Sequence, residues 1–242
     1  MLKTKSSKFI LIISVLIIIA LTVFGVLYNK GLTDFSKAEK YTEGQIKVAC
    51  VGDSVTYGYG IWKCHKNNYP AVLSGLLGEE YHVSNFGISG STIQDSGDQP
   101  YTATKAYRNS IDYEADILIF MLGSNDTKPE NWNGEEAFRA AYTQLLDSYM
   151  QKDKKLTVYL CTPATAFFPE GITEGLSNYD VQPHLIEDVA DIVRDIAKEK
   201  NLPLIEINNL TENRRDLFGK DNVHPNNDGA EAIANAVYEA IK

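Results

Sequence analysis

Residues 46–58 read IKVACVGDSVTYG, a short apolar run that ends at Gly52 and continues into small polar residues. The run is brief and rich in β-branched residues, which is typical of a buried strand bounded by a turn. A strand covered on both faces shows such a nearly continuous apolar run, as in parallel sheets. We therefore predict a strand over residues 46–51 and place Ser54 where the chain turns sharply toward a helix.

The rest of the chain repeats this pattern of apolar runs separated by helical periodicity. Further strands are expected at residues 81–86, 117–122, 156–161 and 204–207, and helices at residues 69–77, 137–149, 185–197 and 226–241. Alternation of strands and helices favours a parallel sheet with helices on both faces. The prediction is an α/β domain with a five-stranded parallel sheet.

Length and charge narrow the classes of protein to which the chain can belong. Its 242 residues suit one α/β domain with an appendage, and 44% hydrophobic residues suffice for a packed core. The 23 Lys and Arg residues stand against 32 Asp and Glu residues, a net charge of −9. Phosphates would repel such a chain, so we expect no nucleic-acid partner.

Cysteine usage argues against a disulfide-stabilised protein and against a zinc site. The three cysteines are Cys50, Cys64 and Cys161, an odd number without the spacing of zinc ligands. Cys50 and Cys161 lie in apolar runs and are expected to be small buried hydrophobes. Dinucleotide, phosphate-loop and metalloprotease motifs are absent from the sequence, so we predict neither a metal nor a cofactor.

The N-terminal segment has the features of a membrane anchor. Residues 9–28 carry no charge and follow three lysines, and 20 residues at about 1.5 Å each span a bilayer core. We predict a cytoplasmic segment 1–8, a transmembrane signal anchor 9–28, a juxtamembrane spacer 29–44 and an extracellular domain 45–242. A cleaved signal peptide and secretion are the alternative, although the apolar run is long and lacks an Ala-x-Ala site.

Polar clusters follow the predicted strands or open a helix. They occupy residues 52–58, 85–91, 123–126 and 221–225. Parallel strands end at one edge of their sheet, and chemistry in such folds collects at this carboxyl edge. The four clusters are therefore expected to meet.

Together these clusters contain the groups that acyl transfer needs. A serine hydroxyl requires a base, a histidine base requires an acceptor that holds its tautomer, and the oxyanion requires hydrogen-bond donors. Ser54 is the candidate nucleophile, His224 the base and Asp221 its partner, three residues earlier. The backbone N–H groups of Ser54 and Gly90 and the side-chain amide of Asn125 are the candidate oxyanion donors.

In order along the chain, the four clusters resemble the motifs of the GDSL, or SGNH, hydrolase family. Gly52-Asp53-Ser54 resembles its nucleophile block, and Gly87-Ile88-Ser89-Gly90 its glycine block; Gly123-x-Asn125-Asp126 and Asp221-x-x-His224-Pro225 resemble its asparagine and acid–base blocks. The resemblance implies a flavodoxin-like three-layer αβα sandwich and an esterase or lipase activity without a metal. It implies the same roles for Ser54, Asp221, His224, Gly90 and Asn125. Val55 replaces the leucine of the family name.

Aromatic residues near the clusters suggest a carbohydrate ester as the substrate. Rings that combine apolar area with polar edges suit stacking on sugars. The candidates are Trp132, Tyr57 and Trp62, with Tyr59 and Tyr101 also in these loops, and residues 167–179 are a candidate wall or lid. The leading hypothesis is a serine esterase that removes a short acyl group, O-acetyl in particular, from a small-molecule or glycan ester.

Two other functions stay open at this point. A lysophospholipase or thioesterase would use the same residues on a longer acyl chain or another leaving group. A surface binding module without catalysis would belong to a different class, and the intact Ser54, Asn125, Asp221 and His224 count against it.

Overall fold

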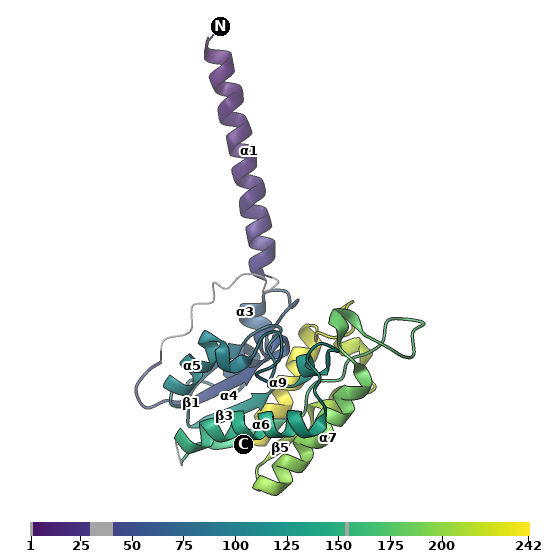
Figure 1. The fold of residues 1–242 in the computed structure, drawn as a ribbon. Coiled ribbons are helices and arrows are strands. Elements are labelled where there is room, and N and C mark those ends of the chain that lie inside the picture. The colour runs from purple at the N-terminus through teal and green to yellow at the C-terminus, as the bar shows by residue number, and fades with distance from the viewer. Residues whose placement is uncertain (1, 30–40, 153–154) are drawn as a thin grey trace.

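A computed structural model describes residues 2–29, 41–152 and 155–242 of the chain (Figure 1). Its five strands are β1 (Ile46–Gly52), β2 (Tyr81–Gly87), β3 (Ile117–Met121), β4 (Thr157–Cys161) and β5 (Leu204–Ile205). All neighbouring strands pair in parallel, in the order β2-β1-β3-β4-β5. This order is the flavodoxin-like one, so both the predicted sheet and its topology are confirmed.

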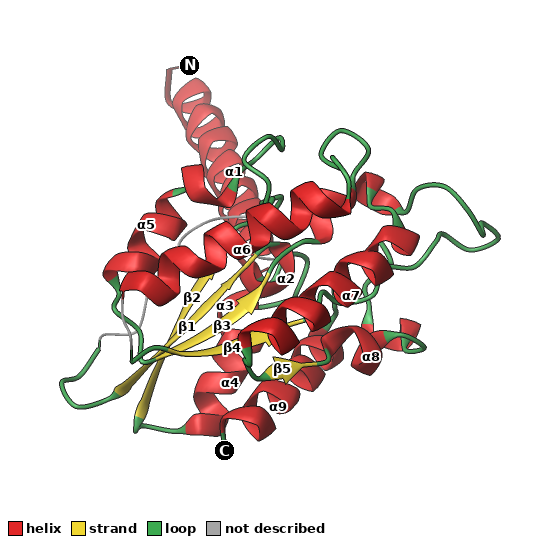
Figure 2. Cartoon of the chain, turned by 60° about the horizontal axis from the view of Figure 1, so that its bottom comes forward, coloured by secondary structure: helices red, strands yellow, loops and turns green. Residues whose placement is uncertain are grey.

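Helices cover both faces of this sheet. The described helices are α1 (Leu2–Asn29), α2 (Ser54–Tyr57), α3 (Cys64–Asn67), α4 (Tyr69–Leu77), α5 (Lys105–Asp112), α6 (Glu135–Lys152), α7 (Pro183–Lys200), α8 (Ile207–Thr211) and α9 (Asn227–Ile241). Short 3₁₀ turns are η1 (Tyr101–Ala103), η2 (Ser124–Thr127), η3 (Asn178–Asp180) and η4 (Arg215–Leu217). Figure 2 shows α5, α6 and α7 on one side of the strands and α4, α8 and α9 on the other.

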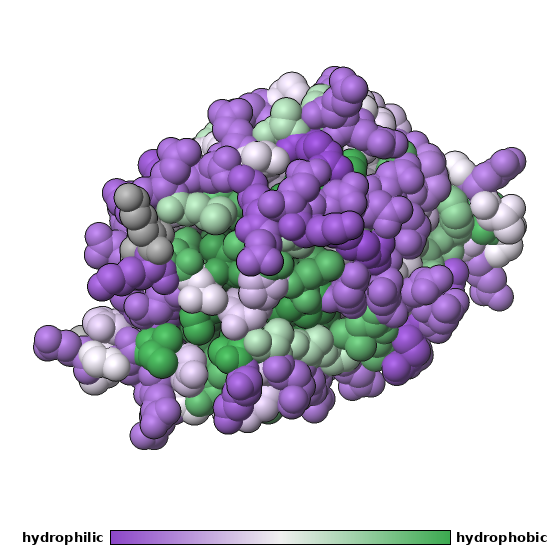
Figure 3. All heavy atoms as spheres, turned by 90° about the horizontal axis from the view of Figure 1, so that it is seen from below, coloured by the Kyte–Doolittle hydropathy of each residue, from purple (hydrophilic) through white to green (hydrophobic). Residues whose placement is uncertain are grey.

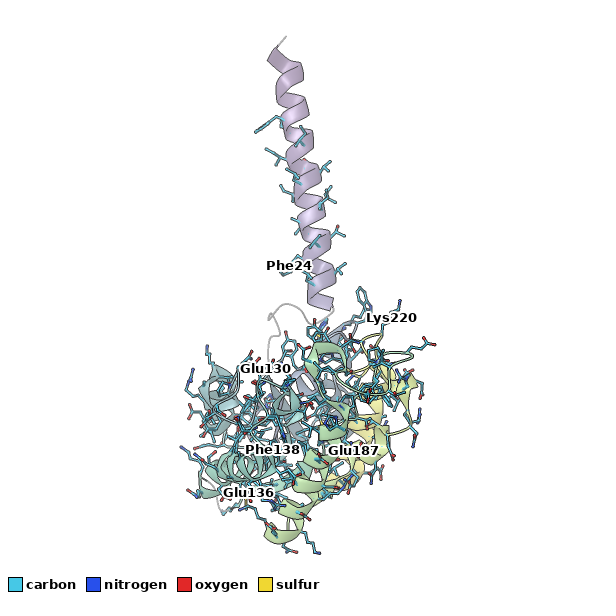
Figure 4. All side chains as sticks on the ribbon, turned by 45° about the vertical axis from the view of Figure 1, so that its right-hand side comes forward. Phe24, Glu130, Glu136, Phe138, Glu187 and Lys220 are labelled. Carbon is cyan, nitrogen blue, oxygen red and sulfur yellow. The ribbon has the colours of Figure 1, made fainter. Side chains whose placement is uncertain are left out.

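The two faces of β1 belong to two separate hydrophobic cores. Val48 and Cys50 point into the core beneath α4 and α9, whereas Ala49 and Val51 point into the core beneath α6 and α7. Successive side chains of a strand alternate between faces, so an apolar run without interruption is buried on both. Figure 4 labels Phe138 of α6, which is fully buried in the second core.

The strand register aligns the ends that carry the polar clusters. Gly52 at the end of β1 pairs with Gly87 of β2 on one side and with Met121 of β3 on the other. The chain segments that follow these three residues therefore leave the same edge of the sheet side by side. A Cβ atom at Gly87 would collide with the backbone of Tyr57, so the absence of a side chain there lets α2 lie against β2.

Several predicted boundaries differ from the observed ones. The last strand ends at Ile205 rather than at residue 207, because Ile207 already begins α8. Helix α5 was not predicted: its eight residues are mostly polar, and only Ala106, Tyr107 and Ile111 pack against the second core. A stretch this short offers too few apolar positions for a helical period to stand out.

The expected membrane anchor is not supported. Residues of the predicted span lie in helix α1, which projects from the sheet domain next to α3 and exposes apolar side chains such as Phe24 (Figure 4). Among the residues that the structure describes, no helix combines the length and the apolar character that a bilayer crossing requires. Residues 30–40 of the predicted spacer lie outside the described residues, and the cellular location stays a prediction.

One face of the domain combines hydrophilic and apolar side chains. Seen from below, hydrophilic side chains surround a central region of apolar ones (Figure 3). Apolar atoms are common on the surfaces of folded proteins, so this region needs no special explanation.

Candidate active site

The position of Ser54 follows from the turn between β1 and α2. Ser54 is the first residue of α2, and the carboxylate of Asp53 accepts the backbone N–H of Val55 at 2.9 Å, which caps the helix. The N–H of a first helical residue has no partner inside the helix. Ser54 thus presents both its hydroxyl and its backbone N–H beyond the carboxyl edge of the sheet.

His224 lies on the loop between η4 and α9. The N–H of Gly219 donates to the carbonyl of His224 at 2.8 Å, and Phe218 and Pro225 form an isolated antiparallel bridge. Asn226 then caps α9 by accepting the N–H of Gly229 at 3.0 Å. These contacts hold the loop at both ends and bring His224 back across 170 residues to Ser54.

The side chains of Ser54, His224 and Asp221 form a continuous hydrogen-bonded chain. His224 Nε2 lies 2.9 Å from Ser54 Oγ, and His224 Nδ1 lies 2.9 Å from Asp221 Oδ2. When Nδ1 carries the proton and donates it to the carboxylate, Nε2 is free to accept the serine O–H. Ser54 and His224 are both buried, at 8% and 6% exposure.

Asp221 is held as an acceptor by more than the imidazole. Its Oδ1 accepts the backbone N–H groups of Val223 at 3.1 Å and of His224 at 2.9 Å. Partial burial raises the pKa of this carboxyl, but the hydrogen bonds from His224 and Val223 outweigh burial and hold the pKa below its usual value. The ionised form of Asp221 is therefore the form that the fold stabilises.

Gly90 and Asn125 lie beside Ser54 in one cavity. Gly90 adopts φ = +85°, which favours glycine, and its backbone N–H makes no hydrogen bond to another part of the described chain. Asn125 is buried, and its amide donates one N–H to the carbonyl of Ser91 at 3.1 Å. An amide has two N–H groups, so a second donor remains for a ligand.

Asp126 braces the loop that carries Asn125. Its carboxylate accepts the backbone N–H groups of Ile93 and Gln94 at distances of 2.9–3.1 Å, which ties η2 to the segment after Gly90. Burial nevertheless raises the pKa of Asp126 to about 7, against the lowering effect of these bonds. The side chain is fully buried and does not line the cavity.

The cavity above Ser54 has a volume of about 150 Å³ and an apolar wall. The wall consists of Val55, Ala164, Ala166, Val181, Ile186 and Val223. Four of these residues, Ala166, Val181, Ile186 and Val223, also form a small hydrophobic cluster of their own. An apolar pocket next to a serine hydroxyl suits the hydrocarbon part of an acyl group.

The three predicted substrate-binding aromatic residues do not line this cavity. Trp132 packs on Phe138 with ring centroids 6.1 Å apart, and Trp62 is 47% exposed on the surface. Tyr57 also lies outside the cavity, because it ends α2 and its carbonyl accepts the amide of Asn68. Tyr101 is fully buried and donates its O–H to the carbonyl of Phe86. The sequence does not determine in which direction each of these loop side chains points.

Tyr59, Tyr179 and Lys128 take the places next to the catalytic candidates. The ring centroids of Tyr59 and Tyr179 lie 4.6 and 5.0 Å from that of His224, and the two tyrosine rings also contact each other edge to face, with centroids 6.0 Å apart. Tyr179 comes from the segment predicted as a wall, and it reaches the cavity through a left-handed backbone conformation, φ = +60°. Such a conformation is uncommon for a residue other than glycine and has no sequence signal here.

Across the described ranges, no three His, Cys, Asp or Glu side chains gather as a metal site would require. Within the described residues, Cys50, Cys64 and Cys161 form no disulfide, and all three are buried, as expected for Cys50 and Cys161.

Comparison with known proteins places the chain in a family. Residues 50–232 match the GDSL-like lipase/acylhydrolase family. An acetylxylan esterase of Xylanibacter ruminicola is 34% identical over 218 residues, which cover 83% of this chain and 44% of that protein. The chain thus spans less than half the length of this relative.

Solved structures share the fold at lower sequence identity. An aryl esterase of M. smegmatis superimposes with a TM-score of 0.67 at 17% identity, covering 81% of this chain and 98% of that one. Est24, a carbohydrate acetylesterase from Sinorhizobium meliloti, gives 0.66 at 15% identity with the same coverage. The family match extends over most of the chain, and the chain therefore belongs to the GDSL-like lipase/acylhydrolase family of carboxylic ester hydrolases.

Proposed function

We propose that the chain is a serine esterase that hydrolyses short acyl esters, O-acetyl in particular, on carbohydrates. The observation that carries the proposal is the chain of two 2.9 Å contacts from Ser54 Oγ through His224 to Asp221. The acetylxylan esterase relative supports a carbohydrate ester, and the small apolar cavity supports a short acyl group.

Acylation uses the three residues in turn. Ser54 Oγ attacks the ester carbonyl while His224 Nε2 takes the serine proton, and Asp221 stabilises the imidazolium through Nδ1–H. The carbonyl oxygen becomes an oxyanion, which accepts hydrogen bonds from the backbone N–H groups of Ser54 and Gly90 and from the Asn125 amide. The C–O bond to the alcohol then breaks, and His224 returns its proton to the leaving oxygen.

Deacylation repeats these steps with water. His224 removes a proton from a water molecule, the resulting hydroxide attacks the acyl-enzyme, and the same donors hold the second oxyanion. The bond to Ser54 Oγ then breaks, which releases the acid, and His224 returns its proton to Oγ, which restores the serine hydroxyl.

Removal of the nucleophile tests the proposal. We expect Ser54→Ala to abolish hydrolysis of p-nitrophenyl acetate, because Ser54 is the cavity serine whose hydroxyl contacts the imidazole of His224, whereas Ser89 and Ser124 make no such contact in the described chain. Ser74→Ala, in α4 and away from the cavity, is the matched control and should retain full turnover. Circular dichroism and thermal melting verify that both variants fold.

A covalent serine probe separates catalysis from mere binding. An organophosphate should add its mass to the peptide that carries Ser54 in the native chain and leave the Ser54→Ala variant unlabelled. Undiminished turnover in Ser54→Ala would reject the nucleophile, and an unlabelled native chain would favour a binding module.

The apolar wall also favours a second candidate, a lysophospholipase or thioesterase with a longer acyl chain. Turnover of p-nitrophenyl esters from acetate to decanoate decides between the two. A maximum at two to four carbons supports the acetylesterase, and a steep rise toward long chains supports the alternative.

A further inference from the structure

The cavity above Ser54 contains one lysine among its lining residues. Lys128 follows η2, three residues after Asn125, and lines the same cavity as Ser54 and Gly90. Its side chain is only 13% exposed, so most of it is packed against the protein. Burial of a charge costs free energy unless a partner compensates for it.

The protein compensates for this charge only in part. Asp98 Oδ2 lies 3.7 Å from Lys128 Nζ, which is longer than a hydrogen bond, and Asp98 is 47% exposed. Asp98 Oδ1 instead accepts the side-chain amide of Asn131 at 2.9 Å. No other acceptor in the described part of the chain lies within hydrogen-bond distance of Nζ, although an ammonium has three N–H donors.

The other residues that line the cavity do not balance the charge. Neither aspartate nor glutamate is among them, and the remaining titratable side chains are His224, Tyr59 and Tyr179. The cavity therefore presents a fixed positive charge within a chain whose net charge is −9. A site of this kind favours a ligand with an anionic group.

The apolar wall of the cavity indicates which part of the ester would carry the anionic group. Ala164, Ala166 and Val223 offer no partner for a charge and suit the acyl chain. An anionic group belongs to the alcohol part, which leaves after acylation.

We propose that Lys128 binds a carboxylate or phosphate on the alcohol part of the ester, so that the preferred substrates are acylated acidic saccharides. This inference rests on the proposed esterase function and adds the class of its leaving group. The group stays bound from substrate to transition state, so Lys128 lowers KM and leaves kcat largely unchanged.

Three acetylated monosaccharides test the proposal: methyl glucuronoside, glucose 6-phosphate and the neutral methyl glucoside. Lys128→Met keeps the hydrocarbon stem and removes the charge, whereas Lys128→Arg keeps the charge. We expect Lys128→Met to raise KM for the anionic esters about tenfold or more, the usual scale for loss of one charge-assisted hydrogen bond. Lys128→Arg should recover part of this loss.

Two controls isolate the local effect. Lys128→Met should raise KM much less for the neutral ester than for the anionic esters, and thermal melting shows that the variant folds. Lys105→Met removes an equal charge from the exposed start of α5 and should leave KM unchanged for every ester. A rise in KM confined to the glucuronoside ester or to the glucose 6-phosphate ester identifies which anion the site prefers.

Equal changes for anionic and neutral esters, or no change for any of them, would overturn the assignment of Lys128. Failure of the wild-type chain to hydrolyse the neutral and both anionic esters, with p-nitrophenyl acetate also unreacted, would instead reject the esterase function itself.

Discussion

His224 is oriented through both of its ring nitrogens and through its backbone. Nε2 contacts Ser54, Nδ1 contacts Asp221 Oδ2, and its backbone N–H donates to Asp221 Oδ1. The carboxylate thus holds the ring and the backbone of one residue at once. Substitution of Asp221 should affect both the tautomer of the imidazole and the stability of its loop.

Asp221→Asn should make the free energy of unfolding less dependent on pH in acid. The fold lowers the pKa of Asp221 below its unfolded value of 3.8, so the unfolded chain binds this proton first as pH falls. Stability from this group is fully present above about pH 5 and is lost as pH falls through the folded pKa. Urea unfolding between pH 2.5 and 6 measures the difference between wild type and variant.

The control for this prediction is Asp112→Asn, an exposed carboxylate at the end of α5 without an ion pair in the described chain. It should follow the wild-type pH dependence. A pH dependence of the unfolding free energy in Asp221→Asn equal to that of wild type would contradict the stabilised carboxylate.

In the same variant we expect kcat to fall by about 10³-fold or more, since the asparagine amide favours the wrong tautomer of His224.

At the scale of elements, the segment between β4 and α7 builds the acyl side of the cavity. Ala164 and Ala166 follow β4 directly, and Val181 precedes α7. Both alanines are about 5% exposed, so a larger side chain at either position has little space outside the cavity. Under the proposed function, we expect their small size to set the length of acyl group that the cavity can hold.

Ala166→Leu should shorten the preferred acyl chain. The added carbons occupy the cavity, and one or two methylene groups are worth about 1–3 kcal/mol in such a pocket. We expect kcat/KM for p-nitrophenyl butyrate to fall about tenfold or more relative to acetate. The measurement is the ratio of the two rates.

Ala140→Leu, on the exposed side of α6, should leave that ratio unchanged and serves as the control. If Ala166→Leu lowers both rates equally, the residue supports the fold and does not limit the acyl chain.

At the scale of the whole molecule, two of the cysteines report on the integrity of the sheet. Cys50 on β1 and Cys161 on β4 are fully buried in one core. Burial raises the pKa of the Cys50 thiol to about 12, despite a hydrogen bond with Tyr69 that lowers it, and burial raises the pKa of Cys161 as well. Only a thiolate reacts rapidly, so both groups are inert in the folded chain.

We expect Cys50 and Cys161 to resist a disulfide reagent at pH 8 until the domain unfolds. Mass spectrometry of the labelled peptides should show reaction at these positions only in denaturant, where all three cysteines of the chain become modified. Rapid labelling of either residue in the native chain would mean that the sheet opens locally without global unfolding.

The strands and the catalytic candidates were predictable because each has a local cause. An apolar run such as residues 46–51 has to be buried on both faces, and parallel strands have to end at a common edge. That edge brings Ser54 and Asn125 near one another, and the contacts of the loop before α9 add His224. The membrane anchor was expected from an apolar run in the same way, and the structure does not support it.

Sequence alone determined the order of the strands and helices and the residues that meet at the carboxyl edge. Tertiary structure decided which side chains enter the cavity: it turns Trp132 onto Phe138 and Trp62 to the surface, and it brings in Tyr179 and Lys128. The reason is physical. Burial and strand pairing depend on the spacing of apolar residues along the sequence. The direction of a loop side chain depends instead on backbone angles and on neighbours that lie far away in the sequence.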